Sequence, residues 1–231
     1  MTQLRIAIIG PGRMGQAVAE LARQRGDVVV ATIDAQHPVT RESLAGADVA
    51  IEFTEPAAAA ANVLACVDAG CPCVVGTTGW YHALPRVSDA VAALQGALLW
   101  SPNFSLGVQA LLQIARRAGE LSARLAGFDA HILEIHHAAK KDAPSGTAVM
   151  LRDAFVHGTP RDVPITSVRV GAVPGTHQLM LDGAFEQIVL SHEVRDRRVF
   201  ADGALVAAHW LVGRQGVFTL ADVVAASENE S

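Results

Sequence analysis

The sequence predicts an α/β protein, with a Rossmann-like doubly wound parallel sheet followed by a second, α+β domain with a mixed sheet. Short apolar runs alternate with helix-like segments through the first hundred residues, which is typical of parallel strands joined by right-handed helical crossovers. The runs are apolar almost throughout, as expected of strands covered on both faces. The second half instead combines one long helical segment with strand-like runs separated by glycines.

The elements of the first half follow in order. Short apolar runs predict strands at residues 4–9, 28–33, 49–53, 72–75 and 97–100. Helical spacing predicts helices at residues 16–25, 57–69 and 84–95, ending at Gly26, Gly70 and Gly96. Pro56 precedes the second helix, at a position where the first helical turn tolerates proline.

The second half predicts one long helix over residues 105–125, a strand over 130–136 and a helix after Ser145. From residue 163 to 209 the pattern predicts strands joined by glycine turns, as at Pro174-Gly175 and Asp202-Gly203. We therefore expect one domain over residues 1–104, to which residues 206–231 return, and a second domain over residues 105–205.

Composition narrows the class of protein. The chain has 231 residues, 51% of them hydrophobic and 18% charged, with a formal net charge of -5. This is globular composition and predicts neither a nucleic-acid nor a membrane partner. The chain begins with a strand-like run rather than a signal peptide, and three cysteines without a pairing framework predict reduced thiols in the cytoplasm.

A glycine-rich turn predicts a dinucleotide site. Residues 10–15 match G-x-G-x-x-G, with a strand before them and a helix after them. Gly10 permits the tight turn, Gly12 lets the backbone approach a pyrophosphate, and Gly15 lets helix and strand pack closely. A plain glycine turn is the competing interpretation, and the flanking elements favour the nucleotide. The expected cofactor-binding residues here are Ile9, Gly10, Pro11, Gly12, Arg13 and Met14.

Asp34 ends the next predicted strand, where a carboxylate accepts hydrogen bonds from the adenosine ribose. Its charge repels a 2′-phosphate unless an arginine compensates, and no arginine is adjacent, the nearest being Arg41. We therefore expect binding of NADH or NADPH with a preference for NADH. The alternative for Asp34 is an ordinary solvated acid at a strand end.

Two further loops lie where ligands bind in open parallel sheets, after the carboxyl ends of strands. Gly76, Thr77 and Thr78 offer hydroxyls and amides to the ribose or nicotinamide amide, although a plain glycine-bounded loop fits the same residues. The second loop, a candidate nicotinamide platform, is Ser101, Pro102, Asn103 and Phe104. Asn103 or Ser105 equally fits the N-cap of the long helix.

The densest chemistry lies between Glu134 and Thr147. His136 and His137 end a strand, and histidines titrate near neutral pH. Lys140 and Lys141 follow, and adjacent ammonium groups disfavour each other's charge, so that one becomes a candidate proton donor. The amides of Gly146 and Thr147, at a helix start, form an anion pocket. Each feature alone also fits an ordinary hydrogen-bonding group, a solvated turn or a helix cap; their coincidence predicts a site for a small carboxylate substrate. The spacing is not that of a zinc helix, and no metal is expected.

These residues resemble a known family. The run from Glu134 to Ala148 resembles the signature of the 4-hydroxy-tetrahydrodipicolinate reductases, E-x-H-H-x-x-K-x-D-A-P-S-G-T-A, and every fixed position is present. The resemblance covers nearly the whole chain. It extends to the glycine turn, the 76–79 loop, Asn103, Phe104, Ser105, Gly107, His192, Arg197, Phe200, Gly203, Ala204 and Trp210.

The resemblance implies NAD(P)H-dependent reduction of a cyclic dicarboxylate imine to tetrahydrodipicolinate, in lysine and diaminopimelate biosynthesis. It implies His136 and Lys140 as catalytic residues, with Lys140 donating a proton. It implies that His137, Gly146 and Thr147 bind substrate carboxylates, with Arg197 as a further contact. It also implies a homotetramer, with the second domain binding substrate and forming the interface.

Two departures from the family bear on the cofactor. The stretch between Asp34 and Asp48 is short, and Glu55 stands where some members have arginine; both weaken the case for NADPH. Two other functions remain open from the sequence: another Rossmann-fold amino-acid dehydrogenase, or a non-catalytic nucleotide-sensing domain.

Overall fold

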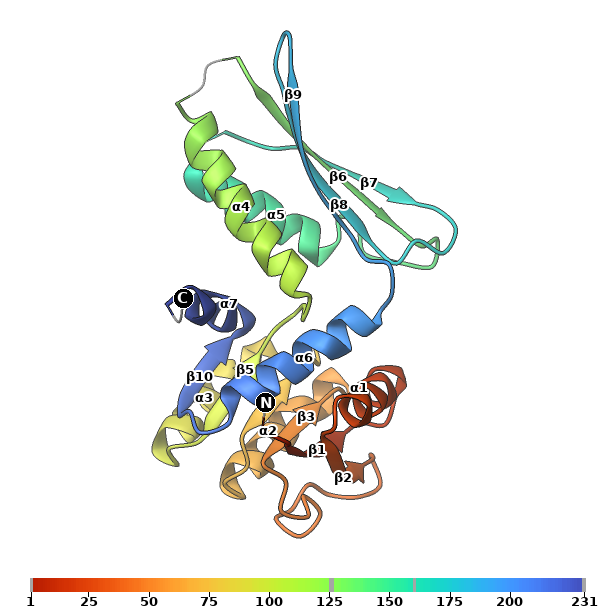
Figure 1. The fold of residues 1–231 in the computed structure, drawn as a ribbon, viewed down its shortest axis with the longest axis vertical. Coiled ribbons are helices and arrows are strands. Elements are labelled where there is room, and N and C mark those ends of the chain that lie inside the picture. Colours follow the sequence, from red (N-terminus) through yellow and green to blue (C-terminus); the bar gives the residue numbers. More distant parts are fainter. Residues whose placement is uncertain (1, 125–126, 160, 230–231) are drawn as a thin grey trace. The chain divides into compact units, whose positions relative to one another are not determined.

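The computed structural model describes residues 2–124, 127–159 and 161–229, which divide into two compact units (Figure 1). The first unit comprises the residues up to Ser105 and from Arg198 onward, and the second runs from Leu106 to Arg197. The sequence placed the return to the first unit at about residue 206. The structure places it at Arg198, because a whole helix belongs to the returning segment.

Six strands form the sheet of the first unit, and every neighbouring pair is parallel. Their order is β10-β5-β4-β3-β1-β2, so the order reverses between β1 and β3, the point outside which open sheets bind ligands. The Rossmann-like doubly wound sheet predicted from the sequence is confirmed. The strands are β1 Arg5–Ile9, β2 Val28–Ile33, β3 Val49–Glu52, β4 Cys73–Val75, β5 Ala97–Trp100 and β10 Gly216–Thr219.

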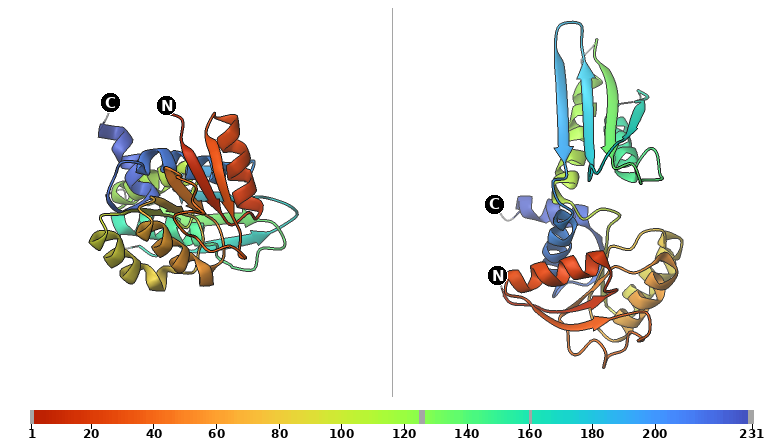
Figure 2. Two further views of the ribbon diagram at one scale, coloured as in Figure 1. Left: turned by 90° about the horizontal axis from the view of Figure 1, so that it is seen from below. Right: turned by 90° about the vertical axis from the view of Figure 1, so that its right-hand side faces the viewer.

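Helices cover both faces of this sheet (Figure 2). Helices α1 (Arg13–Gln24) and α6 (Arg198–Leu211) lie on one face, and α2 (Pro56–Asp68) and α3 (Leu84–Ala93) on the other. A short 3-10 turn (Tyr81–Ala83) precedes α3, and α7 (Leu220–Asn229) follows β10. This double cover explains why strands such as β3 are buried along their whole length.

The three cysteines belong to the core of the first unit. Cys66, Cys71 and Cys73 are free and buried, and burial raises the pKa of Cys71 to about 12. They therefore pack as small hydrophobic side chains.

Residues 198–211 form helix α6, so the prediction of strands through residue 209 was wrong in this stretch. Gly203 lies inside the helix rather than in a turn. A Cβ there would lie 1.7 Å from the backbone oxygen of Phe104. The glycine therefore serves close packing of the helix on the chain below it, which a turn pattern does not distinguish.

The second unit has a four-stranded sheet in the order β7-β6-β8-β9. Strand β6 (Asp129–His136) runs parallel to β7 (Ile165–Arg169) and antiparallel to β8 (Thr176–Asp182), which pairs antiparallel with β9 (Gln187–Glu193). The predicted mixed sheet is confirmed.

Two helices pack on the sheet of the second unit. Helix α4 (Leu106–Ser122) ends earlier than the predicted residue 125, which lies outside the described residues, and α5 (Gly146–Gly158) follows Ser145 as predicted. Gly119 and Gly158 let α4 and α5 touch backbone to backbone. Among the described residues, no helix combines the length and apolar character needed to cross a membrane.

Candidate active site

The glycine turn between β1 and α1 leaves open space at the start of the helix. Gly10 has φ 91°, and a Cβ there would lie 2.2 Å from the backbone oxygen of Phe53. A Cβ on Gly15 would lie 2.1 Å from the backbone oxygen of Gly10. At Gly12, the N-cap of α1, a Cβ would meet nothing within 4 Å. The turn thus packs tightly on one side and leaves Gly12 open on the other, as a pyrophosphate at a helix N-terminus requires.

The other predicted residues of this turn surround that open side. Pro11 and Arg13 are exposed, Met14 is half-buried and Ile9 is buried at the end of β1. Within the first unit these residues all lie at the carboxyl edge of the sheet, beside the reversal of strand order.

Asp34 follows β2 and is exposed, and its Oδ1 already accepts two hydrogen bonds. His37 Nδ1 donates at 2.7 Å and the Gln36 backbone N–H at 2.9 Å. These bonds, that from His37 first, lower the pKa of Asp34, so the carboxylate is ionised at neutral pH. Arg41 makes no ion pair with Asp34 in the described part of the chain, and residues 34–48 contain no helix or strand.

Behind the 76–79 loop lies a wholly buried carboxyl group, that of Glu52. Its Oε1 is in contact with Thr54 Oγ1 and 3.4 Å from Asn62 Nδ2. The Thr77 hydroxyl accepts the Thr54 backbone N–H at 2.7 Å, so it points into the protein, whereas Thr78 is exposed. Burial raises the pKa of Glu52, and hydrogen bonds from Thr54, Thr77 and Asn62 oppose that effect only in part.

The loop after β5 is ordered by its own polar groups. Ser101 Oγ donates to the Asn103 backbone oxygen at 2.7 Å, and Asn103 Oδ1 accepts the Ser105 N–H at 2.8 Å. The ring of Phe104 packs edge-on against Phe53, with centroids 6.1 Å apart. Pro102 is exposed. The predicted role of Asn103 at the helix start is therefore present, and it does not exclude a ligand role.

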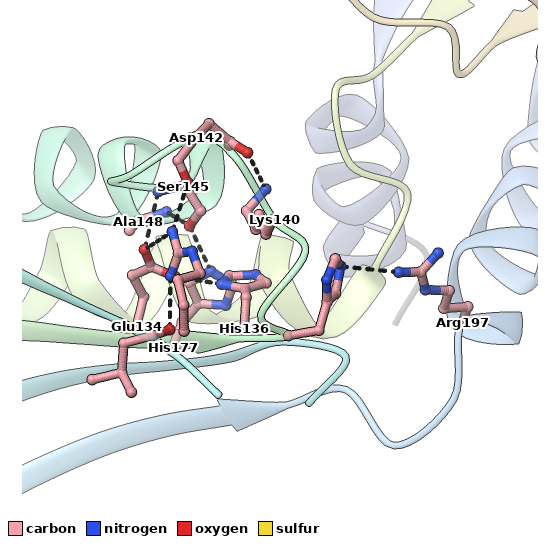
Figure 3. A network of polar contacts seen from close by, with 11 residues as sticks. Glu134, His136, Lys140, Asp142, Ser145, Ala148, His177 and Arg197 are labelled. Carbon is pink, nitrogen blue, oxygen red and sulfur yellow. Dashed lines mark hydrogen bonds and ion pairs between the residues drawn. The ribbon is translucent and has the colours of Figure 1, made fainter. Parts of the chain in front are cut away.

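In the second unit, the carboxyl end of β6 gathers the predicted catalytic histidine with residues from two other strands (Figure 3). Glu134 and His136 lie on the same face of β6, and His136 Nδ1 is in contact with Glu134 Oε2. Strand register places Arg169 beside His136 and His177 opposite Glu134. Arg169 Nη2 donates to Glu134 Oε1 at 2.7 Å, and the rings of His136 and His177 meet edge-on at 5.1 Å.

The pKa values of Glu134, His136 and His177 are all shifted, and the shifts determine which side chains of this cluster are charged. Burial alone would raise the pKa of Glu134, but hydrogen bonds from Arg169, Ser167 and His136 outweigh it and hold that pKa at about 2. Burial lowers the pKa of His136 although Glu134 opposes the shift. Burial and the neighbouring His136 lower the pKa of His177 to about 4. At neutral pH the cluster therefore holds an ionised Glu134 and uncharged histidines.

Lys140 and the start of α5 complete the polar surface around this cluster. Lys140 Nζ lies 2.8 Å from Asp142 Oδ1. Ser145 caps α5 by accepting the Ala148 N–H at 3.2 Å, and its Oγ lies 3.1 Å from His177 Nε2. At the helix start, Gly146 is exposed and a Cβ there would meet nothing within 4 Å. The first N–H groups of a helix point out of its N-terminus and suit an anion, and at the start of α5 they are those of Gly146 and Thr147.

His137 and Arg197 form a second polar pair in this unit. Arg197 Nη2 donates to His137 Nε2 at 3.3 Å. Figure 3 shows Arg197 apart from the Glu134, His136 and His177 side chains. The unit thus offers cationic and N–H groups at two places, an arrangement that suits a substrate with two carboxylates.

Glu134, His136 and His177 also form a group of metal-ligand type, with ligand atoms within 4.8 Å of one another in the part of the chain that the structure describes. Their hydrogen bonds argue against a cation. The Glu134 carboxylate already holds Arg169 and the Ser145 N–H, so an ion would have to displace a guanidinium. The expectation of no metal stays a prediction.

Sequence reasoning singled out His136, His137, Lys140, Gly146 and Thr147, and all lie in the second unit. It did not assign roles to Glu134, Arg169 or His177. The alternation of Glu134 and His136 along one strand was a readable signal, because residues two apart share a face. Arg169 and His177 gave none, because strand register alone brings them there.

Comparison with known proteins identifies relatives along the whole chain. Residues 4–104 match the model for "Dihydrodipicolinate reductase, N-terminus" and residues 107–224 that for "Dihydrodipicolinate reductase, C-terminus". The 4-hydroxy-tetrahydrodipicolinate reductase of Gluconobacter oxydans is 39% identical over 95% of this chain and 96% of its own. That of Christiangramia forsetii is 32% identical over 96% of this chain and 98% of its own.

A solved structure shares the fold. It is a dipicolinate-bound dihydrodipicolinate reductase from Paenisporosarcina sp. TG-14, with a TM-score of 0.80 and 22% identity over 94% of this chain and 98% of that one.

Proposed function

Because the chain belongs to the dihydrodipicolinate reductase family, we propose that it reduces 4-hydroxy-tetrahydrodipicolinate, by way of dihydrodipicolinate, to tetrahydrodipicolinate with NAD(P)H. The reaction is a step of lysine and diaminopimelate biosynthesis. The observation that carries this proposal is 39% identity over 95% of the chain to a reductase of that name. The intact Glu134 to Ala148 segment, with its cluster of histidines and a lysine, supplies the chemistry.

The first unit binds the cofactor. The open side of Gly12 and the N-terminus of α1 suit the pyrophosphate. The ionised Asp34 suits the ribose hydroxyls and repels a 2′-phosphate, which supports a preference for NADH over NADPH. The exposed residues of the 76–78 and 101–104 loops extend this site along the sheet edge.

The second unit binds the substrate. The N–H groups of Gly146 and Thr147 hold one carboxylate, and His137 with Arg197 holds the other. The related structure from Paenisporosarcina carries dipicolinate, a small dicarboxylate of the class that these groups suit.

Proton delivery falls to Lys140 and His136. A bound nicotinamide supplies the hydride. Hydride addition to a conjugated C=C–C=N system leaves an electron-rich enamine that must be protonated. The Lys140 ammonium donates that proton once it leaves Asp142, its partner at 2.8 Å. His136, neutral because burial lowers its pKa, holds and exchanges protons beside it.

The test is oxidation of NADH or NADPH at 340 nm, coupled to enzymatic generation of 4-hydroxy-tetrahydrodipicolinate. We expect substrate-dependent oxidation, faster with NADH. Oxidation only with another amino-acid substrate would establish a different dehydrogenase. Cofactor binding without turnover of any substrate would establish a nucleotide sensor.

We also propose a homotetramer assembled through the second unit. A groove of about 440 Å³ runs between α4 and the edge of the sheet, and its apolar side chains are partly exposed. They include Ile114, Leu121, Ile188 and Leu190. Light scattering after size exclusion should give four times the chain mass of 24.2 kDa; a monomer would refute the assembly.

A further inference from the structure

Glu134 is a carboxylate to which three parts of the proposed site are attached. Its side chain is wholly buried. Oε2 is in contact with His136 Nδ1, while Oε1 accepts Arg169 Nη2 at 2.7 Å and the Ser145 N–H at 3.3 Å. The same Arg169 Nη2 donates to the backbone oxygen of Asp142 at 2.6 Å. One carboxylate thus joins the catalytic ring, the loop of Lys140 and Asp142, and the start of α5.

Arg169 keeps this buried carboxylate ionised. An uncompensated buried carboxylate would take up a proton. Hydrogen bonds from the Arg169 guanidinium, the Ser167 side chain and His136 instead hold the pKa of Glu134 at about 2, against the effect of burial. An ionised carboxylate only accepts hydrogen bonds. The ring nitrogen of His136 that faces it must therefore carry a proton.

The ionised Glu134 carboxylate determines the tautomer of His136. A neutral imidazole has one N–H, and in His136 this N–H is at Nδ1, where it donates to Glu134 Oε2. Nε2 then has the free lone pair. It lies beside Gly175, where a Cβ would come within 3.1 Å of it, so a side chain at position 175 would crowd that nitrogen.

We propose that Glu134, held by Arg169, is a positioning residue that fixes the Nδ1–H tautomer of His136 and so reserves Nε2 for proton exchange with the substrate. The proposal rests on the reductase function proposed above. It differs from a purely structural role for the Glu134–Arg169 pair, which would leave the ring free to exchange tautomers.

Glu134→Gln separates the two roles with little change of shape. Arg169 and the Ser145 N–H both donate to Oε1, so the glutamine oxygen must take that position. The NH₂ group of the glutamine side chain must then face His136 Nδ1. That NH₂ donates, and the ring proton moves to Nε2. The variant therefore keeps its contacts but holds the wrong tautomer, a change that costs a factor of about 10²–10⁴ in kcat where a histidine transfers the proton.

The variant also changes the titration of His136. The Glu134 charge raises the pKa of His136, whereas Lys140 and Arg169 lower it, and His177 packs against the ring. Removing only the Glu134 charge leaves the opposing groups in place. The ionisation of His136 in the pH profile of kcat/KM should move to lower pH.

The experiment is long-range ¹H–¹⁵N NMR of the histidine rings in the intact protein, with the His136 signals assigned by their loss in His136→Asn. We expect Nδ1–H in the parent protein and Nε2–H in Glu134→Gln, with kcat reduced at least about 100-fold and the affinity for NADH unchanged. The matched control is Glu120→Gln, which removes an exposed carboxylate paired with Arg117 at 2.7 Å on α4. It should change neither the tautomer nor the pH profile.

An Nε2–H tautomer in the parent protein would overturn the proposal without any variant. So would Glu134→Gln that folds, retains Nδ1–H and keeps the parent pH profile. A parent protein without turnover would refute the reductase function instead, and the NMR comparison would still decide whether Glu134 determines the tautomer.

Discussion

Glu52 and Glu134 are both wholly buried near the carboxyl ends of strands, yet their pKa values move in opposite directions. Glu134 faces a guanidinium, so its anionic form is stabilised. Glu52 has only hydroxyl and amide partners, and its Oε2 is buried without a hydrogen-bond partner among the described residues. One residue type thus supplies a stabilised anion in the second unit and, in the first, a carboxyl group whose pKa is raised by burial.

The raised pKa of Glu52 predicts a pH-dependent stability. Above pH 4.5, the ordinary value, the unfolded chain releases the proton that the folded protein retains. The contribution of Glu52 to stability is therefore present below pH 4.5 and is lost as pH rises through its folded pKa. Glutamine at position 52 does not ionise, so Glu52→Gln does not lose stability in this way as the pH rises. The free energy of unfolding of the variant minus that of the parent should therefore increase between pH 4.5 and 8. Urea unfolding followed by circular dichroism measures the difference.

The control for that prediction is Glu20→Gln on the exposed face of α1, which should show no such trend. A difference between Glu52→Gln and the parent that stays constant over the pH range would contradict the raised pKa.

Lys140 is the proposed proton donor, and the adjacent Lys141 provides its matched control. Lys140→Ala should lower kcat by about 10²–10⁴-fold, the range for a missing general acid. The Kd for NADH, measured by fluorescence, should not change, because Lys140 belongs to the second unit and the proposed cofactor loops to the first. Lys141→Ala should retain kcat within a few-fold. Equal losses in both variants would point to loop charge rather than proton donation.

At the scale of elements, glycines inside helices set how closely the helices pack. Gly203 brings α6 against the backbone of Phe104, which follows β5. Gly119 plays the same part between α4 and α5, where a Cβ would lie 2.1 Å from the backbone oxygen of Phe155. Phe104 also contacts Phe53, so the position of α6 bears on the loops at the carboxyl edge of the sheet.

Gly203→Ala should destabilise the protein, although alanine is the better helix former by about 1 kcal/mol. The new methyl group would lie 1.7 Å from the Phe104 oxygen, and such overpacking costs about 3 kcal/mol. Asp202→Ala, which breaks only the exposed ion pair with Arg25, should cost less than about 1 kcal/mol. Thermal unfolding of both variants gives the comparison, and a stabilised Gly203→Ala would show that α6 does not pack this closely.

At the scale of the whole molecule, the first unit is discontinuous and the second is one continuous segment. The residues from Arg198 onward supply α6, which covers one face of the sheet, and β10, which pairs with β5. Without them β5 becomes an unpaired edge and apolar strand faces meet water. Folding of the first unit therefore depends on chain that is synthesised after the second unit.

This organisation predicts how fragments behave. Residues 106–197 alone should unfold cooperatively in urea, whereas residues 1–105 alone should not. Joining Ser105 to Arg198 by a short glycine-serine linker should restore cooperative unfolding. The linker need span only about five helical residues, roughly 8 Å, because Gly203 touches Phe104. A cooperative fold for residues 1–105 alone would contradict the dependence on α6 and β10.

The sequence by itself determined the fold class, the glycine turn at Gly10–Gly15 and the segment carrying His136 and Lys140. These are local patterns, in which periodicity and spacing along the chain carry the information. Only the tertiary structure decided that Arg169 and His177 join Glu134 and His136, because strand register brings together residues more than thirty positions apart. It also decided that Gly203 packs a helix and that the Thr77 hydroxyl points inward. A glycine or a threonine has the same identity in a turn, a helix or a core, and its neighbours in space determine which role it takes.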